Sequence, residues 1–394
     1  MNTQGMDKGN GKANGPSPGG DWTAREIAQQ PQVWREVESL VARERARLDA
    51  FLRPLLADDR LRVVLTGAGT SAYIGACLAP ALGRALQRRV DAVATTDIVS
   101  GPARYLARTQ PTLLVSFARS GGSPESLAAI ELAEQAVDHV HHLVITCNAH
   151  GALAQRMAAA PNARVLVLPD AMHDRAFAMT SSFTGMVLAG AQVFGLLGEG
   201  RVALLSRACA AAMPRMETLA AELAVRGFER AVFLGSNELQ SLAAEAALKT
   251  LELTDGRIVA MSQSVLGFRH GPKTVVNDRT LVVVFVSNDE YARAYDYDLL
   301  RELRREARAG EIVAVGATLD GALLDPQVGF AGLHDATDLE LVLPCVVFGQ
   351  VLALRQSLAQ GLTPDNPNAT GVVNRVVQGV TIHPWSEPDD VPRR

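Results

Sequence analysis

Two turns rich in hydroxyl groups and glycine could bind an anion. Each follows a short apolar run and opens a helical pattern, so free N–H groups and the positive end of the helix dipole are available there. Hydroxyls donate hydrogen bonds, glycine lets the backbone approach a ligand closely, and an arginine adds a full charge. The pattern predicts a phosphate site made by Gly69, Thr70, Ser71, Arg119, Ser120, Gly121 and Ser123.

Each turn taken alone has a simpler interpretation. Ser71 could merely cap its helix, and segment 67–72 also resembles a dinucleotide-binding turn with alanine at the third glycine position. A dinucleotide motif gives the second turn no role, whereas two such turns at the carboxyl ends of parallel strands favour one phosphate. The corresponding turns 235–239 and 287–290 contain acidic residues that would repel phosphate. The sequence therefore predicts one phosphate site per chain, in the first half.

A second group of residues has the types needed for acid–base chemistry. Glu245, Lys249 and Glu252 are spaced i, i+4 and i+7, so they project from one face of a helix predicted over 239–253. A solvated, salt-bridged face would show the same spacing, but the intervening alanines and leucines favour a charged stripe facing a cleft. His270 lies in a nearby turn. Loop histidines are commonly exposed without a role, yet a glutamate and a histidine beside a sugar phosphate form an acid–base pair.

Alternating strand and helix patterns must position these groups. Apolar strands are predicted at 61–66, 89–95, 111–116, 143–147 and 164–168, and again at 230–235, 257–261, 281–287, 311–315 and 339–343. Buried strands separated by helices predict an α/β fold with two tandem domains, each a five-stranded parallel sheet with helices on both faces. Gly67 and Gly235 hold equivalent strand-to-helix turns, which suggests an internal duplication.

The domain organisation follows from these patterns. We expect a disordered tail at 1–20, a helical lead-in at 21–56 shaped as a hairpin interrupted at Pro31, and a phosphate-binding domain over 57–205. A second domain over 228–374 would carry the acid–base residues, before a C-terminal tail at 375–394. A long helical stretch is predicted at 183–226 and a last helix at 345–360.

Composition and charge narrow the class of protein. The net charge of −4 over 394 residues gives no reason to expect a nucleic acid or membrane partner. The N-terminus has no apolar signal core, and the apolar run 186–198 is too short to span a bilayer, so we expect a cytoplasmic protein.

The cysteines and histidines do not show the spacing of a metal site. The cysteines lie in apolar stretches, which predicts buried free thiols at Cys77, Cys147, Cys209 and Cys345. His139, His141 and His142 are predicted to occupy a solvated loop. We therefore expect neither a metal nor a cofactor.

In its motifs the sequence resembles the sugar isomerase (SIS) family. The matching segments are TGAGTSA at 66–72, RSGGSPES at 119–126, EAALKTLEL at 245–253 and FRHGPK at 268–273. Segments 23–31 and 364–383 are similar to its group of AgaS-type galactosamine-6-phosphate deaminase/isomerases, also labelled tagatose-6-phosphate ketose/aldose isomerases. The resemblance covers nearly all of the chain except the first twenty residues, and it implies two flavodoxin-like sheets.

The resemblance also implies roles for individual residues. Ser71, Ser120 and Ser123 would bind phosphate with Arg119 beside them. By analogy with the isomerase domain of glucosamine-6-phosphate synthase, Glu252 would move a proton between C1 and C2 of the sugar. Glu245 and Lys249 match motif positions of that domain, and His270 matches its ring-opening histidine. Because this histidine commonly comes from a neighbouring subunit, a homodimer or larger homo-oligomer is implied.

The sequence departs from the synthase in two ways. It lacks the glutaminase domain, and at the synthase's C-terminal catalytic lysine the closest residues are Asn374 and Arg375. The missing ammonia source favours deamination of an amino-sugar 6-phosphate, with galactosamine 6-phosphate giving tagatose 6-phosphate and ammonia. A plain aldose–ketose isomerase, a deglycase and a non-catalytic sugar-phosphate sensor are the alternatives. Thr180, Ser181 and Arg375 could line the pocket, although the first two could equally cap the next helix.

Overall fold

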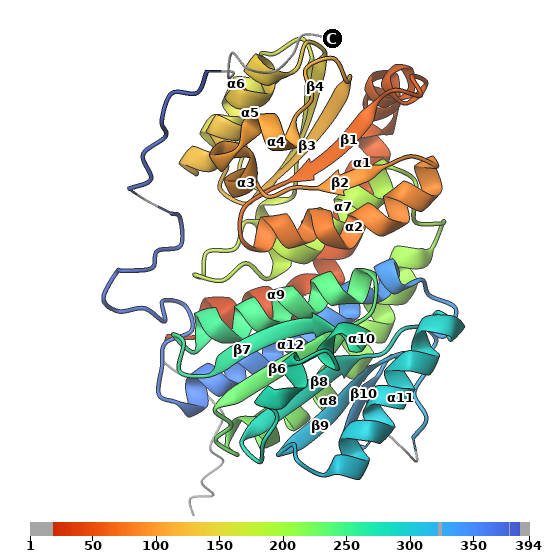
Figure 1. Cartoon of the computed structure of the whole chain (residues 1–394), viewed down its shortest axis with the longest axis vertical. Helices are drawn as coiled ribbons and strands as arrows, with labels where there is room; N and C mark the ends of the chain where they lie inside the picture. The colour runs from red at the N-terminus through yellow and green to blue at the C-terminus, as the bar shows by residue number, and fades with distance from the viewer. Residues whose placement is uncertain (1–18, 322–324, 378, 387–394) are drawn as a thin grey trace, which may run out of the picture.

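Two parallel five-stranded sheets form the framework of the protein (Figure 1). The computed structural model describes residues 19–321, 325–377 and 379–386. The first sheet has the order β2-β1-β3-β4-β5 and the second the order β10-β9-β8-β6-β7, so both follow one topology counted from their own first strand. This bears out the predicted α/β fold with two sheets.

The strands are short and mostly buried, as their apolar sequences predict. The first sheet consists of β1 Arg62–Thr66, β2 Val90–Ala92, β3 Thr112–Ala118, β4 Val140–Thr146 and β5 Ala163–Val167. The second consists of β6 Arg230–Gly235, β7 Val259–Ser264, β8 Thr280–Phe285, β9 Glu311–Gly316 and β10 Gln327–Gly329.

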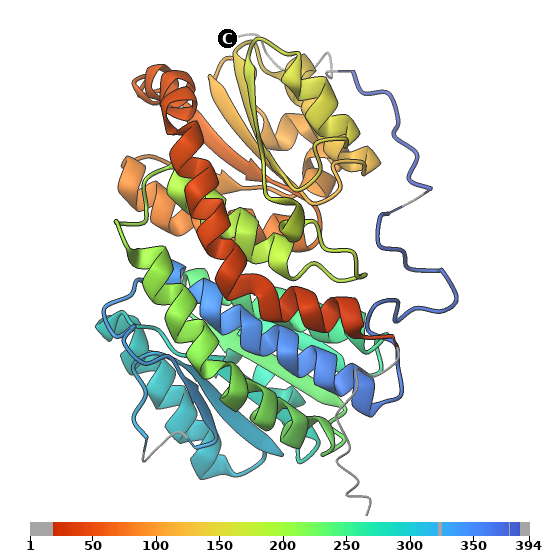
Figure 2. The same ribbon diagram turned by 180° about the vertical axis from the view of Figure 1, so that it is seen from behind.

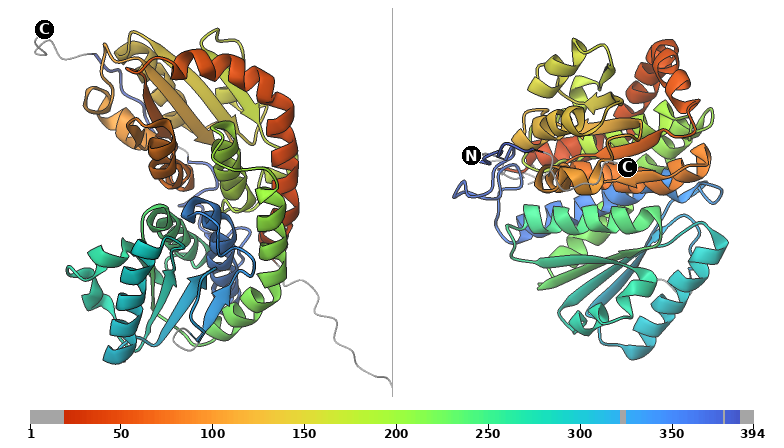
Figure 3. Two further views of the ribbon diagram at one scale, coloured as in Figure 1. Left: turned by 90° about the vertical axis from the view of Figure 1, so that its right-hand side faces the viewer. Right: turned by 45° about the horizontal axis from the view of Figure 1, so that its top comes forward.

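Helices cover both faces of each sheet. Four helices of the described chain lie between the two sheets: α2 Thr70–Leu86, α7 Ser181–Val193, α9 Glu238–Leu253 and α12 Asp338–Ala359. Two further helices, α1 Asp21–Leu56 and α8 Arg201–Ala224, pack against each other and together run along one side of the two domains (Figure 3). The outer faces carry α3 Thr95–Ser100, α4 Pro102–Tyr105, α5 Pro124–Ala136, α6 Ala152–Ala158, α10 Val265–Phe268 and α11 Glu290–Glu306. Single-turn 3₁₀ helices lie at Asp170–Met172 and Pro272–Val275. One continuous apolar core joins the inner faces of both sheets.

The predicted N-terminal hairpin is wrong, because α1 is a single helix that continues through Pro31 and bends (Figure 2). A proline inside a helix leaves the carbonyl four residues earlier without its N–H donor. Here the side chain of Gln30 donates to that carbonyl, on Ile27, at 3.0 Å. The local hydrogen bond therefore replaces the lost one. The expected tail at 1–20 lies almost wholly outside the described residues.

The strand predicted at 339–343 is also wrong. This segment is the first turn of α12, and the fifth strand of the second sheet is β10. Thr337 and Glu340 form a reciprocal capping box that starts the helix seven residues before the predicted start at 345. Because α12 is buried on nearly every side, its apolar run has no helical periodicity. By length and hydropathy α12 could cross a membrane, but 89% of its most apolar stretch is buried inside the protein.

Two smaller expectations need correction and one is confirmed. The helical stretch 183–226 is two helices, α7 and α8, separated by a turn in which Gly195 and Gly200 have positive φ. His141 and His142 belong to β4 rather than to a solvated loop, and burial lowers the pKa of the fully buried His142 to about 4. All four cysteines are buried free thiols, as predicted.

Candidate active site

The two hydroxyl-rich turns lie beside each other at one edge of the first sheet. Strands β1 and β3 are parallel neighbours with Thr66 paired to Ser116, and β3 continues to Ala118, so the turns that follow them leave the same edge of the sheet. Gly67 is required for the first turn, because a Cβ there would lie 2.6 Å from the backbone of Ser71. Gly69 and Gly121 have φ of 56° and 62°, which only glycine adopts without strain.

The serines of these turns make local hydrogen bonds. Ser123 is the N-cap of α5, accepting from the N–H of Ser126 at 3.3 Å and sharing a 2.7 Å hydroxyl contact with it. The hydroxyl of Ser120 accepts from the N–H of Gly122 at 3.3 Å. The Ser71 hydroxyl is buried and lies 3.8 Å from the Met179 sulfur. A serine cap is therefore present at Ser123 but not at Ser71, because α2 has Gly69 as its N-cap residue and no side-chain cap. The N–H groups of a helix start that no cap uses remain available to an anion.

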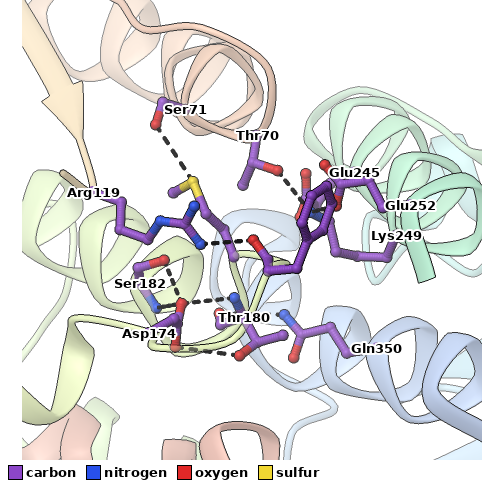
Figure 4. Close-up of polar contacts among 12 residues, drawn as sticks. Thr70, Ser71, Arg119, Asp174, Thr180, Ser182, Glu245, Lys249, Glu252 and Gln350 are labelled. Atoms are coloured by element: carbon purple, nitrogen blue, oxygen red, sulfur yellow. Dashed lines mark hydrogen bonds and ion pairs between the residues drawn. The ribbon is translucent and has the colours of Figure 1, made fainter. Parts of the chain in front are cut away.

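Arg119 does not project freely into its turn. Its side chain is 7% exposed (Arg119 is labelled in Figure 4). One guanidinium N–H donates to the Phe177 carbonyl at 2.9 Å, and another donates to the Arg375 carbonyl at 2.7 Å. Burial lowers the pKa of Arg119, with the charge of Arg375 adding to the effect. Through these hydrogen bonds Arg119 connects the loop before α7 and the C-terminal tail to the glycine-rich turn that follows β3.

The predicted charged stripe lies at the junction between the two domains. Lys249 is its centre: the ammonium donates to Thr70 Oγ1 at 2.9 Å, lies 3.4 Å from Glu245 Oε1, and forms a shorter ion pair with Glu252 (Figure 4). Glu245 and Lys249 are fully buried, whereas the Glu252 side chain is 24% exposed. Only Glu252 of the three can therefore meet a ligand without rearrangement. The cleft-facing interpretation is favoured over a solvated face.

Burial sets the charges of this group. Desolvation raises the pKa of Glu245 to about 8 in spite of nearby Lys249, and neither oxygen of Glu245 makes a hydrogen bond with the described residues. Burial alone would lower the pKa of Lys249, but the carboxyls of Glu245 and Glu252 outweigh it and the pKa is raised. At neutral pH the lysine is charged and pairs with Glu252, while Glu245 holds a proton.

Thr70, predicted as a phosphate ligand, makes a further contact that the sequence did not indicate. It is the first residue of α2, and its hydroxyl oxygen accepts from Lys249 of α9, so it joins the phosphate turn of one domain to the acid–base helix of the other. Its spacing in the sequence gives no sign of this contact, because the two residues are 179 positions apart.

His270 is exposed, and no hydrogen bond or ion pair joins it to Glu252 in the described part of the chain. The neighbouring Arg269 and Lys273 both pair with Glu302 of α11, and Val265 and Phe268 of α10 pack with α11 on the outer face of the second sheet. Helix α9, which carries the charged stripe, instead packs on the inner face. The segments on either side of His270 are thus attached to the outer face of the sheet.

Thr180 and Ser181 serve the start of α7, with Asp174 as their acceptor. The buried Asp174 carboxylate accepts from the N–H groups of Thr180 at 2.8 Å, Ser181 at 3.1 Å and Ser182 at 2.9 Å, and also from their hydroxyls. Its contacts with Thr180 and Ser182 are drawn in Figure 4. Thr180 is the N-cap residue of α7, but its side chain accepts no hydrogen bond from the helix, so Asp174 supplies the cap in place of Thr180 and Ser181. Both of these residues are fully buried. Sequence reasoning missed Asp174, because it lies six residues before the cluster and the loop returns only in the fold.

Glu26 and Arg375 both form hydrogen bonds with the backbone of the loop that contains Asp174 and precedes α7. Glu26 of α1 accepts from the N–H groups of Arg175 and Ala176, and burial, with a contribution from Asp174, raises the pKa of Glu26 to about 7. Arg375 of the tail donates to the carbonyls of Asp174 and Ala176. This loop therefore connects the lead-in helix, the phosphate turn and the tail.

The described residues contain no group of three or more histidine, cysteine or acidic side chains placed to hold a metal ion. The groups that this arrangement offers for chemistry are a carboxylate, an ammonium and hydroxyl-rich helix starts.

Comparisons with known proteins agree with this geometry. The SIS domain family matches residues 55–195. AgaS of Streptomyces coelicolor is 54% identical over 370 residues, covering 92% of this chain and 95% of the relative. An Escherichia coli protein named D-galactosamine-6-phosphate deaminase AgaS is 45% identical, covering 93% and 96%. The crystal structure of tagatose-6-phosphate ketose/aldose isomerase from Escherichia coli superposes with a TM-score of 0.86 at 41% identity, covering 94% of this chain and 100% of that one. The chain belongs to the AgaS family of SIS-domain proteins.

Proposed function

We propose that this protein is an enzyme that converts galactosamine 6-phosphate and water to tagatose 6-phosphate and ammonia. The carrying observation is the position of Lys249, which joins the phosphate turn through Thr70 and the partly exposed Glu252 through an ion pair. Relatives at 54% and 45% identity support the substrate class, since the Escherichia coli relative is named a D-galactosamine-6-phosphate deaminase.

The phosphate would be held by the two turns at the edge of the first sheet. α2 begins at Thr70 and α5 begins at Pro124. The N–H groups of their first turns would bind phosphate there with the hydroxyls of Ser71, Ser120 and Ser123, except that Pro124 has no N–H and the N–H of Ser126 donates to Ser123. Arg119 adds charge from behind the turn. This anchor fixes one end of the sugar, and the reacting carbons extend toward α9.

Glu252 is the base in this proposal. Its carboxylate takes the proton from C2 of the open-chain sugar and returns it to C1. Meanwhile O1 gains a proton and the C2 nitrogen loses one, so the C1 aldehyde becomes an alcohol and the C2 amine becomes an imine. Water then adds to the imine carbon and ammonia leaves, which gives the ketose. A positioned base of this kind contributes about 10²–10⁴-fold to the rate. Lys249 holds the Glu252 carboxylate in place through their ion pair.

His270 would open the sugar ring from a second copy of the chain. The resemblance to the synthase domain suggests this assignment, and two observations support it: His270 is exposed, and the adjoining helix α10 packs on the outer face of the second sheet. The active unit would then be a homodimer or a larger homo-oligomer, and the reaction would take place in the cytoplasm.

Glu252→Gln tests the base. Ammonia release from galactosamine 6-phosphate should fall by about 10²–10⁴-fold, while calorimetry shows that tagatose 6-phosphate still binds. Glu222→Gln makes the same chemical change at an exposed position of α8 and should leave the rate unchanged. Undiminished ammonia release by Glu252→Gln would refute the assignment. Formation of tagatose 6-phosphate from galactose 6-phosphate, with no ammonia from the amino sugar, would instead identify a plain isomerase.

A mixing experiment tests the shared site. Glu252→Gln and His270→Asn should each be inactive alone. Random exchange of subunits between them restores one complete site in each mixed dimer, or about a quarter of the wild-type activity for a twofold assembly. Continued inactivity of the mixture, with exchange confirmed by mass spectrometry, would show that His270 serves its own chain.

A further inference from the structure

An arginine-rich hollow lies at the end of the first sheet opposite the phosphate turns. Its volume is about 630 Å³, and it is formed by the loops that precede β1, β2 and β3. We call it the arginine hollow, after its lining residues Arg60, Arg62, Arg88, Arg89 and Arg104. Because the phosphate turns follow β1 and β3, the length of the strands separates the two places. Nothing in the proposed reaction uses this hollow.

Two of the arginines are fixed in position. Arg62 Nε donates to Asp91 at 2.7 Å, and the same guanidinium donates to the Tyr105 carbonyl. Arg88 donates to the carbonyls of Leu56 at 2.8 Å and Asp58 at 3.0 Å. The buried Nε of Arg88 has no acceptor among the described residues. Fixed donors lose little freedom when a ligand binds, so these two groups form a preorganised floor.

The other three arginines are exposed groups at the rim. The side chains of Arg60 and Arg89 are 78% and 83% exposed, and their ion-pair partners Asp58 and Asp91 are 34% and 15% exposed. Arg104 is exposed and has no carboxylate partner among the residues that the structure describes. Exposed pairs of this kind are weak, so these guanidiniums can turn toward a ligand at small cost.

The hollow is positively charged in an acidic protein. Five guanidiniums face three carboxylates, those of Asp58, Asp59 and Asp91, which leaves a surplus of two positive charges. The whole chain has a net charge of −4, so this concentration is local. Like charges gathered in one hollow repel each other unless an anion binds between them. A phosphate monoester carries about −1.5 to −2 at pH 7, which matches the surplus.

We propose that the arginine hollow is a second anion site that binds a small phosphate-bearing molecule independently of the active site. Guanidinium forks match the oxygens of a phosphate, and the volume lies within the roughly 300–1,000 Å³ of small-molecule sites. Inorganic phosphate and an organic phosphate monoester share this chemistry, so both are needed as probes.

Calorimetric titration of the full chain with inorganic phosphate and with adenosine 5′-monophosphate tests the site. The double variant Arg89→Ala/Arg104→Ala should lose one phosphate site per chain, from two to one, and ammonia release should stay within twofold of the wild type. Arg305→Ala/Arg308→Ala removes the same charge from exposed positions and should keep both sites. Binding of adenosine 5′-monophosphate that disappears in the first variant identifies a monoester as the ligand, and loss of phosphate binding alone identifies inorganic phosphate.

Equal stoichiometry and affinity in the two double variants would overturn the proposal. The count also separates this inference from the proposed function. If the phosphate turns of the active site do not bind phosphate, the wild type shows one site and the Arg89→Ala/Arg104→Ala variant shows none.

Discussion

Replacing Glu245 with glutamine should remove a pH-dependent loss of stability. The carboxyl is fully buried in α9, and the groups that face it are Lys249 and Glu252 on the same helix and Thr70 and Tyr73 on α2. Burial raises the pKa of Glu245 to about 8, so the folded protein holds a proton that the unfolded chain releases near pH 4.5. The unfolding free energy should therefore fall as the pH rises from about 4.5 through 8.

The size of the effect follows from the pKa difference. The rise from 4.5 to about 8 is about 3.5 pH units, and one unit corresponds to about 1.4 kcal/mol, so the upper limit is about 5 kcal/mol. Relaxation of the buried site reduces this figure, and we expect roughly 2–4 kcal/mol. Glutamine has nearly the same shape as a protonated glutamate and cannot ionise. The variant should match the wild type near pH 5 and exceed it increasingly up to about pH 8.

Urea unfolding followed by circular dichroism between pH 5 and pH 9 measures the difference. Other buried groups also titrate in this range, including Glu26 and Asp296, so only the difference between variant and wild type isolates Glu245. Glu222→Gln on the surface of α8 is the matched control and should show no pH-dependent difference. A constant difference between Glu245→Gln and the wild type at pH 5 and pH 9 would refute the protonated state that we assign.

Three further substitutions test the positioning of the site. Asp174→Asn removes the carboxylate that accepts from N–H groups at the start of α7. The unfolding free energy measured in urea should fall by roughly 2–4 kcal/mol, and an unchanged midpoint of urea unfolding would contradict the capping role of Asp174. Gly67→Ala forces the turn away from Ser71 and should raise KM at least about tenfold, and an unchanged KM would show that the turn does not bind substrate. Thr70→Val keeps the shape of the side chain but removes the hydroxyl that accepts from Lys249, so kcat should fall about tenfold with a smaller change in KM. A rise in KM with unchanged kcat would instead indicate that Thr70 binds the phosphate.

The fold was largely predictable because its signals are local. Nine of the ten strands were placed correctly from buried apolar runs bounded by turns. The exception, at 339–343, is an apolar run inside α12. Because this helix is buried on nearly every side, its sequence shows neither the 3.6-residue period of a helix nor the alternation of a strand. The capping box of Thr337 and Glu340 was the available signal for a helix start, and it outweighs the composition of the run.

The candidate site was predictable only where one element carries it. Glu245, Lys249 and Glu252 share one helix face, so their spacing alone brought them together. The contact of Lys249 with Thr70 spans two domains, and no periodicity records it. The sequence predicted that the Arg119 guanidinium would add charge inside the turn after β3. A long side chain can reach several acceptors, and in the fold this guanidinium donates to carbonyls of the loop before α7 and of the C-terminal tail.

The sequence by itself determined the two parallel sheets, the two glycine-rich turns and the charged stripe of Glu245, Lys249 and Glu252, because hydrophobic period and helix spacing act within a few residues of chain. Only the tertiary structure decided which groups lose water. Burial at the domain junction raises the pKa of Glu245 and leaves Glu252 partly exposed. Desolvation depends on what packs around a group from distant parts of the chain, and that packing is absent from any local pattern.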